Sequence, residues 1–183
     1  MVDRKQDVDH LFWLDMEMTG LDPEKENIIE IASLITDKDL NVLEHGPNLV
    51  IKQPDELLAK MDDWNQKQHS KTGLIDEVKN SLITLVEAEE QTLAFLKGYC
   101  FPKTTPLCGS GVHHDRRFII KYMPALNEYL NYRLVDVSSF KAMVRRWYPK
   151  AEGLPYKETA HRAKADVLES IGELKHIREN FFK

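Results

Sequence analysis

The chain has 183 residues and a mass of 21.3 kDa, which fits one domain of ordinary size with a sizeable core. Hydrophobic residues make up 42% of it, yet no stretch approaches the ~20 consecutive apolar residues of a transmembrane helix, so no membrane partner is expected. The net charge of -5 argues against binding a long nucleic acid along an extended surface, because that affinity comes mostly from lysine and arginine. A non-nucleic-acid substrate, a ligand with few phosphates and an acidic metal site remain open.

Three strands are predicted in the N-terminal part of the chain. Residues 10 to 19 are rich in aromatic and branched side chains and end at Gly20 and the Asp22-Pro23 pair. A second strand is predicted over residues 27 to 37 and a third over about 41 to 51. The short connections between them predict an antiparallel meander.

Helices alternate with shorter strands in the rest of the chain. Residues 54 to 72 carry apolar side chains at helical spacing, among them Leu57, Met61 and Trp64. Beyond them we predict helices over residues 81 to 99, 115 to 123, 138 to 148 (capped by Ser138) and 163 to 181, and strands over 106 to 110 and 132 to 137. This order predicts a single α/β domain over residues 1 to 183, with helices on both faces of a mixed sheet.

The two cysteines, Cys100 and Cys108, are too few for a disulfide framework. The polar first ten residues contain no apolar segment of the kind that signal peptides carry. Together these features predict a cytoplasmic protein in which both thiols are small buried residues.

Asp15 and Glu17 are the first candidate functional residues. Alternate side chains of a strand share a face, so these two acids point one way while Leu14 and Met16 point the other. A strand with one solvated face would accommodate them without any function. However, the strand then opens into a loop, where functional side chains are common.

Asp115, His161 and Asp166 each have an ordinary structural explanation. Aspartate is a preferred N-cap, and Asp115 stands where a helix is predicted to begin. His161 and Asp166 are five residues apart, a rotation of ~140° within a helix, so they would face different directions. They converge only if His161 lies on the loop before the helix and Asp166 in its first turns.

Taken together, these residues predict a metal-dependent hydrolase. Four carboxylates can hold two divalent cations ~3.5–4 Å apart, an arrangement that suits hydrolysis of a phosphodiester. Imidazole titrates near neutral pH, so His161 is the candidate general base. This chemistry requires no organic cofactor.

The sequence resembles the DEDDh exonucleases of the ribonuclease-H-like fold, and within them the oligoribonucleases. The shared segments include W-L-D-M-E-M-T-G-L-D (13 to 22), D-R-R-F (115 to 118), Y-R-L-V-D-V-S (132 to 138), R-R-W-Y-P (145 to 149) and H-R-A-K-A-D (161 to 166). The resemblance implies a mixed sheet of five strands, three antiparallel and then two parallel. It also implies a 3′→5′ exoribonuclease that cuts very short RNA, chiefly dinucleotides, to 5′-mononucleotides.

The resemblance assigns roles to individual residues. Asp15, Glu17, Asp115 and Asp166 would bind two Mg²⁺ or Mn²⁺ ions, and His161 would be the catalytic base. The family forms homodimers, and in the resemblance Tyr132 and Arg133 would reach across the dimer to the substrate. Leu21 would be a wedge between the bases, with Trp64 and His69 in the pocket. Ser138 and Lys141 would seal the 5′ phosphate. Without the resemblance, Trp64 is interpreted as helix core and Tyr132 as an ordinary strand residue.

The chain departs from the family pattern at Gly111, Ala165 and Asn131, where the family usually has serine, an acidic residue and histidine. Two alternatives remain: another DEDDh exonuclease that acts on longer strands, and a non-catalytic module that binds dinucleotides. The net charge of -5 argues against an exonuclease for longer strands, which would need a more basic binding surface. Intact ligands argue against the second, because four converging acids without chemistry only reduce stability.

Overall fold

The computed structural model describes residues 5–148 and 161–182. Their strands form a five-stranded sheet in the order β3-β2-β1-β4-β5. β1 pairs antiparallel with β2, and β2 with β3, whereas β4 and β5 run parallel to β1. The strands are β1 (Leu11–Met18), β2 (Ile28–Thr36), β3 (Val42–Val50), β4 (Leu107–Gly109) and β5 (Leu134–Asp136). The predicted mixed sheet is confirmed, and each of its first three strands is one residue shorter at either end than predicted.

The described part of the chain contains eight helical segments. They are α1 (Asp55–Leu58), α2 (Asp63–Lys71), α3 (Leu74–Asn80), α4 (Leu85–Tyr99), α5 (His113–Tyr122), α6 (Pro124–Tyr129), α7 (Val137–Trp147) and α8 (Ala163–Phe181). The bounds of α8 agree with the prediction. Pro149, the last residue of the shared segment 145 to 149, lies outside the described residues.

Local capping explains where the predicted helices were wrong. The helix predicted over 54 to 72 is broken, because the Asp62 side chain caps a new helix by accepting from Asn65 N–H. Gly73, with φ of 76°, then ends α2 and precedes α3. The helix predicted from residue 81 begins at Leu85, because Thr84 and Glu87 form a capping box.

Two further corrections concern the last third of the chain. Ser138 is not the cap of α7; the Asp136 side chain accepts from Ser138 N–H instead, so the helix begins at Val137. Helix α6 was not predicted, although Pro124 at its first position is a recognised start signal.

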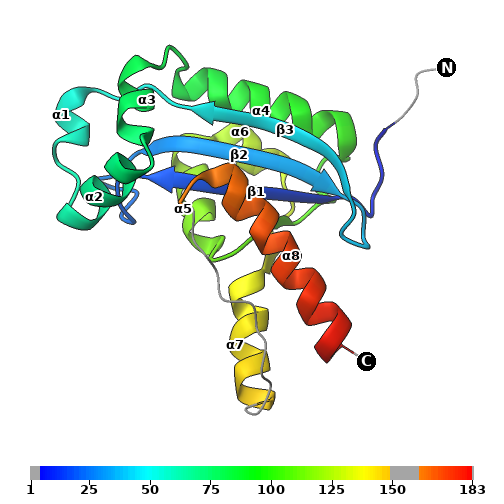
Figure 1. Cartoon of the computed structure of the whole chain (residues 1–183). Coiled ribbons are helices and arrows are strands. Elements are labelled where there is room, and N and C mark those ends of the chain that lie inside the picture. Colours follow the sequence, from blue (N-terminus) through cyan, green and yellow to red (C-terminus); the bar gives the residue numbers. More distant parts are fainter. Residues whose placement is uncertain (1–4, 149–160, 183) are drawn as a thin grey trace.

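Helices cover both faces of the sheet (Figure 1), and a main hydrophobic cluster lies on each face. On one face, Leu14, Met16 and other β1 side chains pack against α4, α5 and α6. On the other face, Trp13 packs against α7 and α8, with α8 crossing β1 and β2. Within the described ranges, no helix combines the length and apolar character required to cross a membrane.

Candidate active site

Asp15 and Glu17 lie on the face of β1 that α8 covers. Their neighbours Leu14 and Met16 point into the opposite core, so the predicted alternation of β1 is present. The face is not the solvated one that would make these acids harmless, because Glu17 is only 9% exposed. A carboxylate at such a position requires a specific partner.

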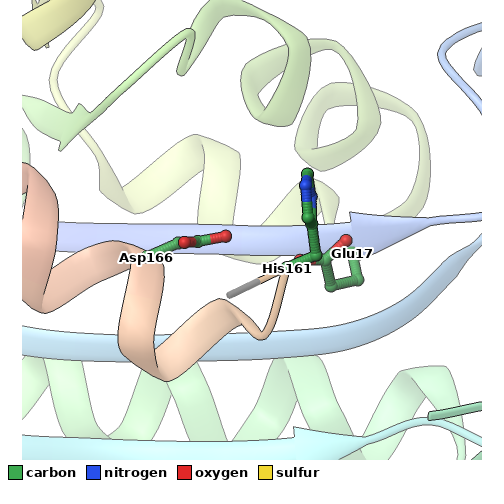
Figure 2. A group of neighbouring side chains, drawn as sticks. All are labelled: Glu17, His161 and Asp166. Atoms are coloured by element: carbon green, nitrogen blue, oxygen red, sulfur yellow. The ribbon is translucent and has the colours of Figure 1, made fainter. Parts of the chain in front are cut away.

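The start of α8 brings two further candidates to Glu17. Asp166 lies in the first turn of the helix and is buried, and His161 precedes the helix, directly before the extended Arg162. Glu17, His161 and Asp166 each offer a potential ligand atom, and these atoms lie within 4.8 Å of one another. Figure 2 shows the Asp166 carboxylate pointing from α8 toward the other two side chains over β1. The convergence therefore uses the loop-then-helix arrangement that the five-residue spacing required.

Asp115 completes the acidic cluster from the side of α5. It is not an N-cap, because the helix begins two residues earlier at His113, and its side chain is buried. Burial, followed by repulsion from the neighbouring Asp15 and Glu17, raises the pKa of Asp115 well above its ordinary value. Asp115 is therefore a buried acid whose charge is opposed by both acids of β1.

The chemistry of this cluster fits divalent cations. Asp15, Glu17, Asp115 and Asp166 supply carboxylate oxygens, the ligands that hard cations prefer. The repulsion of Asp115 by Asp15 and Glu17 is what a bound cation would relieve. Among the four acids, Glu17 and Asp166 have potential ligand atoms within 4.8 Å of each other, close enough to share one cation.

An open hollow of about 470 Å³ lies beside the cluster. Its lining includes Glu17, Leu21 and Trp64. Trp64 is 61% exposed, which overturns its interpretation as helix core, and its ring meets the His161 ring edge-on at a centroid distance of 5.5 Å. The hollow therefore presents an exposed aromatic ring and an exposed leucine beside an acidic side chain.

His69 lies behind Glu17 instead of in the wall of this hollow. It is almost fully buried, its Nε2 is 3.1 Å from the Met18 carbonyl oxygen, and its Nδ1 is 3.9 Å from Glu17 Oε2. A carbonyl can only accept, so Nε2 carries the proton. Burial lowers the pKa of His69, which favours the neutral ring.

Tyr132 and Arg133 lie on the surface. Tyr132 is 75% exposed, and the Arg133 guanidinium lies 4.6 Å from the centre of its ring. Asn131 fixes this segment, because its side chain donates to Lys103 O and accepts from Arg133 N–H. The pair is therefore presented outward on an anchored turn.

Ser138 and Lys141 both have partners within the chain. The Ser138 hydroxyl donates to Asp136, which also accepts from Gly111 N–H at 2.8 Å. The Lys141 ammonium pairs with the Glu173 carboxylate, which is 2% exposed. Lys141 thus neutralises a buried acid of α8 in addition to any contact with substrate.

The structure shows the surroundings of the three residues that depart from the family pattern. Gly111 has φ of 69°, a left-handed conformation that favours glycine. Ala165 is exposed in the first turn of α8. Asn131 serves the turn before Tyr132, as described above.

Sequence reasoning missed a network formed by Glu30, Glu77 and Arg162. Arg162 binds both carboxylates, and the three residues come from β2, α3 and the segment before α8. One signal was available: Glu30 is the single charged residue in the apolar strand Ile28–Thr36, and a buried acid implies a partner. The identity of that partner depends on the tertiary fold.

Comparison with known proteins agrees with this geometry. A family model described as exonuclease (RNase_T) matches residues 12–174. The chain is 48% identical to the oligoribonuclease of Chromobacterium violaceum, a match that covers 97% of this chain and 98% of that protein. It is 52% identical to the Haemophilus influenzae oligoribonuclease over 97% of each chain. The chain belongs to the oligoribonuclease family.

Other matches extend this picture. The human mitochondrial oligoribonuclease is 52% identical over 94% of this chain and 73% of its own length. Among solved structures, Escherichia coli exonuclease I in complex with a 5cy-dT13 oligonucleotide has a TM-score of 0.72 at 16% identity, and the match covers 94% of this chain and 41% of that one. At that identity it shows the shared fold alone. As a member of the oligoribonuclease family, the chain is a nuclease that depends on divalent metal.

Proposed function

We propose that this protein is a 3′→5′ exoribonuclease that cuts very short RNA, chiefly dinucleotides, into 5′-mononucleotides. The observation that carries the proposal is the meeting of Glu17, His161 and Asp166, whose potential ligand atoms lie within 4.8 Å of one another. Membership of the oligoribonuclease family supports the substrate class. The hollow beside these residues supports binding of a small ligand.

Asp15, Glu17, Asp115 and Asp166 would hold two Mg²⁺ or Mn²⁺ ions. Cations bound there would supply an activated water and stabilise the charge on the leaving oxygen. One imidazole nitrogen of His161 accepts the proton of the attacking water. The carboxylates would hold these cations beside His161, and the cations would attract the negatively charged scissile phosphate.

Leu21 and Trp64 would hold the two bases of the substrate. Both are more than half exposed at the edge of the hollow, and Trp64 also contacts the His161 ring. Stacking on exposed apolar and aromatic side chains tolerates every base sequence. His69 would act from behind by fixing Glu17 and the end of β1, since it is buried against both.

Tyr132, Arg133, Ser138 and Lys141 would complete the substrate site in a homodimer. The exposure of Tyr132 in the single chain supports a role toward a partner subunit. Arg133 would give local positive charge for a substrate with few phosphates in a protein of net charge -5. Lys141, whose charge is balanced by Glu173, would add a hydrogen-bond donor to the phosphate. A binding site closed around the 5′ phosphate would then exclude longer substrates.

We also propose that residues 1 to 183 form a single exonuclease domain, which the family match over residues 12–174 supports. A cytoplasmic location stays a prediction from the sequence.

A cleavage assay with purified protein tests the proposal. With Mn²⁺ the protein should convert a dinucleotide to 5′-mononucleotides, and Asp15→Ala should abolish this conversion. Asp39→Asn is the matched control, because Asp39 is a half-exposed acid that pairs with Arg178. Binding of the dinucleotide without any cleavage would identify a binding module instead, and full turnover by Asp15→Ala would refute the metal assignment.

A further inference from the structure

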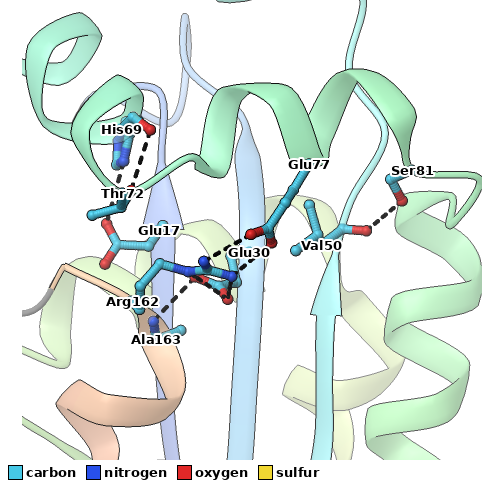
Figure 3. A network of polar contacts seen from close by, with 9 residues as sticks. All are labelled: Glu17, Glu30, Val50, His69, Thr72, Glu77, Ser81, Arg162 and Ala163. Carbon is cyan, nitrogen blue, oxygen red and sulfur yellow. Dashed lines mark hydrogen bonds and ion pairs between the residues drawn. The ribbon is translucent and has the colours of Figure 1, made fainter.

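We infer that Arg162 is a positioning residue for His161. Its guanidinium, held by Glu30 and Glu77, fixes the segment that presents the general base to the carboxylate cluster. The inference rests on the proposed function, in which His161 accepts the proton of the attacking water. The Arg162 side chain points toward Glu77 on α3 and Glu30 on β2 (Figure 3).

Glu30 binds the start of α8 at two adjacent residues. Arg162 Nε lies 3.2 and 3.1 Å from the two oxygens of Glu30, and Nη2 lies 3.0 Å from Oε1. The next backbone amide, Ala163 N–H, donates to Glu30 Oε2 at 3.1 Å. One buried carboxylate of β2 therefore holds both the side chain of residue 162 and the backbone of residue 163.

Glu77 binds the other edge of the same guanidinium. Arg162 Nη1 and Nη2 lie 3.0 and 2.7 Å from the two oxygens of Glu77 on α3. These contacts use the planar fork of donors that only arginine has, so a lysine at this position could not reproduce them. Residue 162 is thus tied to a strand and to a helix on opposite sides.

The position of this anchor relates it to the catalytic residues. Glu30 is the cross-strand partner of Glu17, so Arg162 is fixed directly beside a proposed metal ligand. His161, the adjacent residue, has φ of 47°, a conformation that non-glycine residues adopt only when their surroundings hold them. Trp64 contacts the ring of His161. The contacts of Arg162 and the ring of Trp64 together set the position of the His161 side chain.

Arg162 also neutralises Glu30, and the experiment must separate this effect from the positioning of His161. Glu30 is fully buried, so removal of Arg162 leaves an uncompensated carboxylate across from Glu17. Glu77 is different, because its side chain is 47% exposed. Glu77→Gln therefore weakens the anchor while Arg162 still neutralises Glu30.

The test compares Arg162→Gln and Glu77→Gln with the control Arg178→Gln. Arg178 is also on α8 and binds Asp39 at 2.7 Å, where both side chains are half exposed. On a dinucleotide at saturating metal, we expect kcat to fall roughly 10- to 100-fold for Arg162→Gln, the size of effect that a small misplacement of a catalytic group produces. Glu77→Gln should lose less in kcat, KM should change little for either, and Arg178→Gln should equal wild type.

A double-mutant cycle identifies the route of the effect. In a His161→Ala background, Arg162→Gln should cause no further loss of kcat, because its action passes through the histidine. If the kcat losses of the two single variants multiply in the double variant, the inference is overturned. If Arg162→Gln does not fold, as judged by its Tm, Glu77→Gln decides by the same cycle, and an unchanged kcat for Glu77→Gln would reject the inference.

A readout without metal separates the positioning role from the proposed function. In protein labelled with 5-fluorotryptophan, the ¹⁹F resonance of Trp64, assigned from Trp64→Phe, should shift in Arg162→Gln and not in Arg178→Gln. An unshifted resonance would contradict displacement of His161. If wild-type protein cleaves no dinucleotide, the proposed function fails while this spectrum still tests the anchor.

Discussion

Glu17 on β1 and Glu30 on β2 are direct cross-strand partners, and the structure uses these two buried carboxylates differently. Glu30 is bound by Arg162 and by the backbone at the start of α8. Glu17 instead lies with His161 and Asp166. One acid thus anchors the helix that carries Asp166, and the other joins the proposed metal site that this helix completes.

Replacing the proposed base should slow chemistry without weakening binding. For His161→Ala we expect kcat on a dinucleotide to fall on the order of 10²-fold or more, the usual effect of removing a general base. Isothermal titration should show little change in dinucleotide affinity. A loss of affinity equal to the loss of kcat would assign His161 to substrate recognition.

Asp115→Asn should stabilise the metal-free protein while it abolishes activity. The pKa of Asp115 is raised by burial and by repulsion from Asp15, so its ionised form destabilises the fold without a cation. Removing that charge should increase the free energy of unfolding on the order of 1 kcal/mol, or roughly 2–4 °C in Tm. Thermal unfolding with and without Mn²⁺ measures this, and a lower Tm for the metal-free variant would contradict the account.

The same group sets a pH dependence. A carboxyl whose folded pKa is raised contributes stability below its unfolded pKa, near 4 by ordinary reference values, and loses it as pH rises through the folded pKa. Metal-free wild type should therefore lose stability relative to Asp115→Asn as pH rises from about 4. The difference between the two proteins isolates Asp115 from His69, whose lowered pKa reduces stability as pH falls below its ordinary value near 6.5. A constant difference across this range would refute the assignment.

Lys141→Met should destabilise the fold whatever its effect on substrate. The substitution leaves Glu173 buried without its cation, an effect of about 3–5 kcal/mol for buried pairs. Adding Glu173→Gln should restore most of the stability. If kcat/KM also recovers in the double variant, Lys141 acts structurally; if it stays low at restored stability, Lys141 contacts the phosphate.

Tyr132→Ala should weaken dinucleotide binding and leave metal affinity unchanged. The ring is 75% exposed in the single chain and lies against Arg133, so the carboxylate cluster does not depend on it. Isothermal titration of dinucleotide and of Mn²⁺ checks both expectations. Weakened metal binding would show that this segment supports the metal site itself.

The sequence predicted those parts of the site that depend on local geometry. The alternation of β1 placed Asp15 and Glu17 together, and helical rotation required His161 to precede α8. Asp115 was misjudged when taken alone, because one aspartate gives no means to distinguish a cap from a buried first-turn residue. The Glu30–Arg162–Glu77 network was missed, because it joins residues far apart in the sequence that only the folded sheet brings together.

Turnover as a function of substrate length tests the central claim most directly. Purified protein should be assayed with Mn²⁺ on RNA of two to seven nucleotides, and kcat/KM should be highest for the dinucleotide and fall steeply with each added nucleotide. Comparable kcat/KM for dinucleotides and heptanucleotides would contradict an exoribonuclease specialised in the shortest fragments.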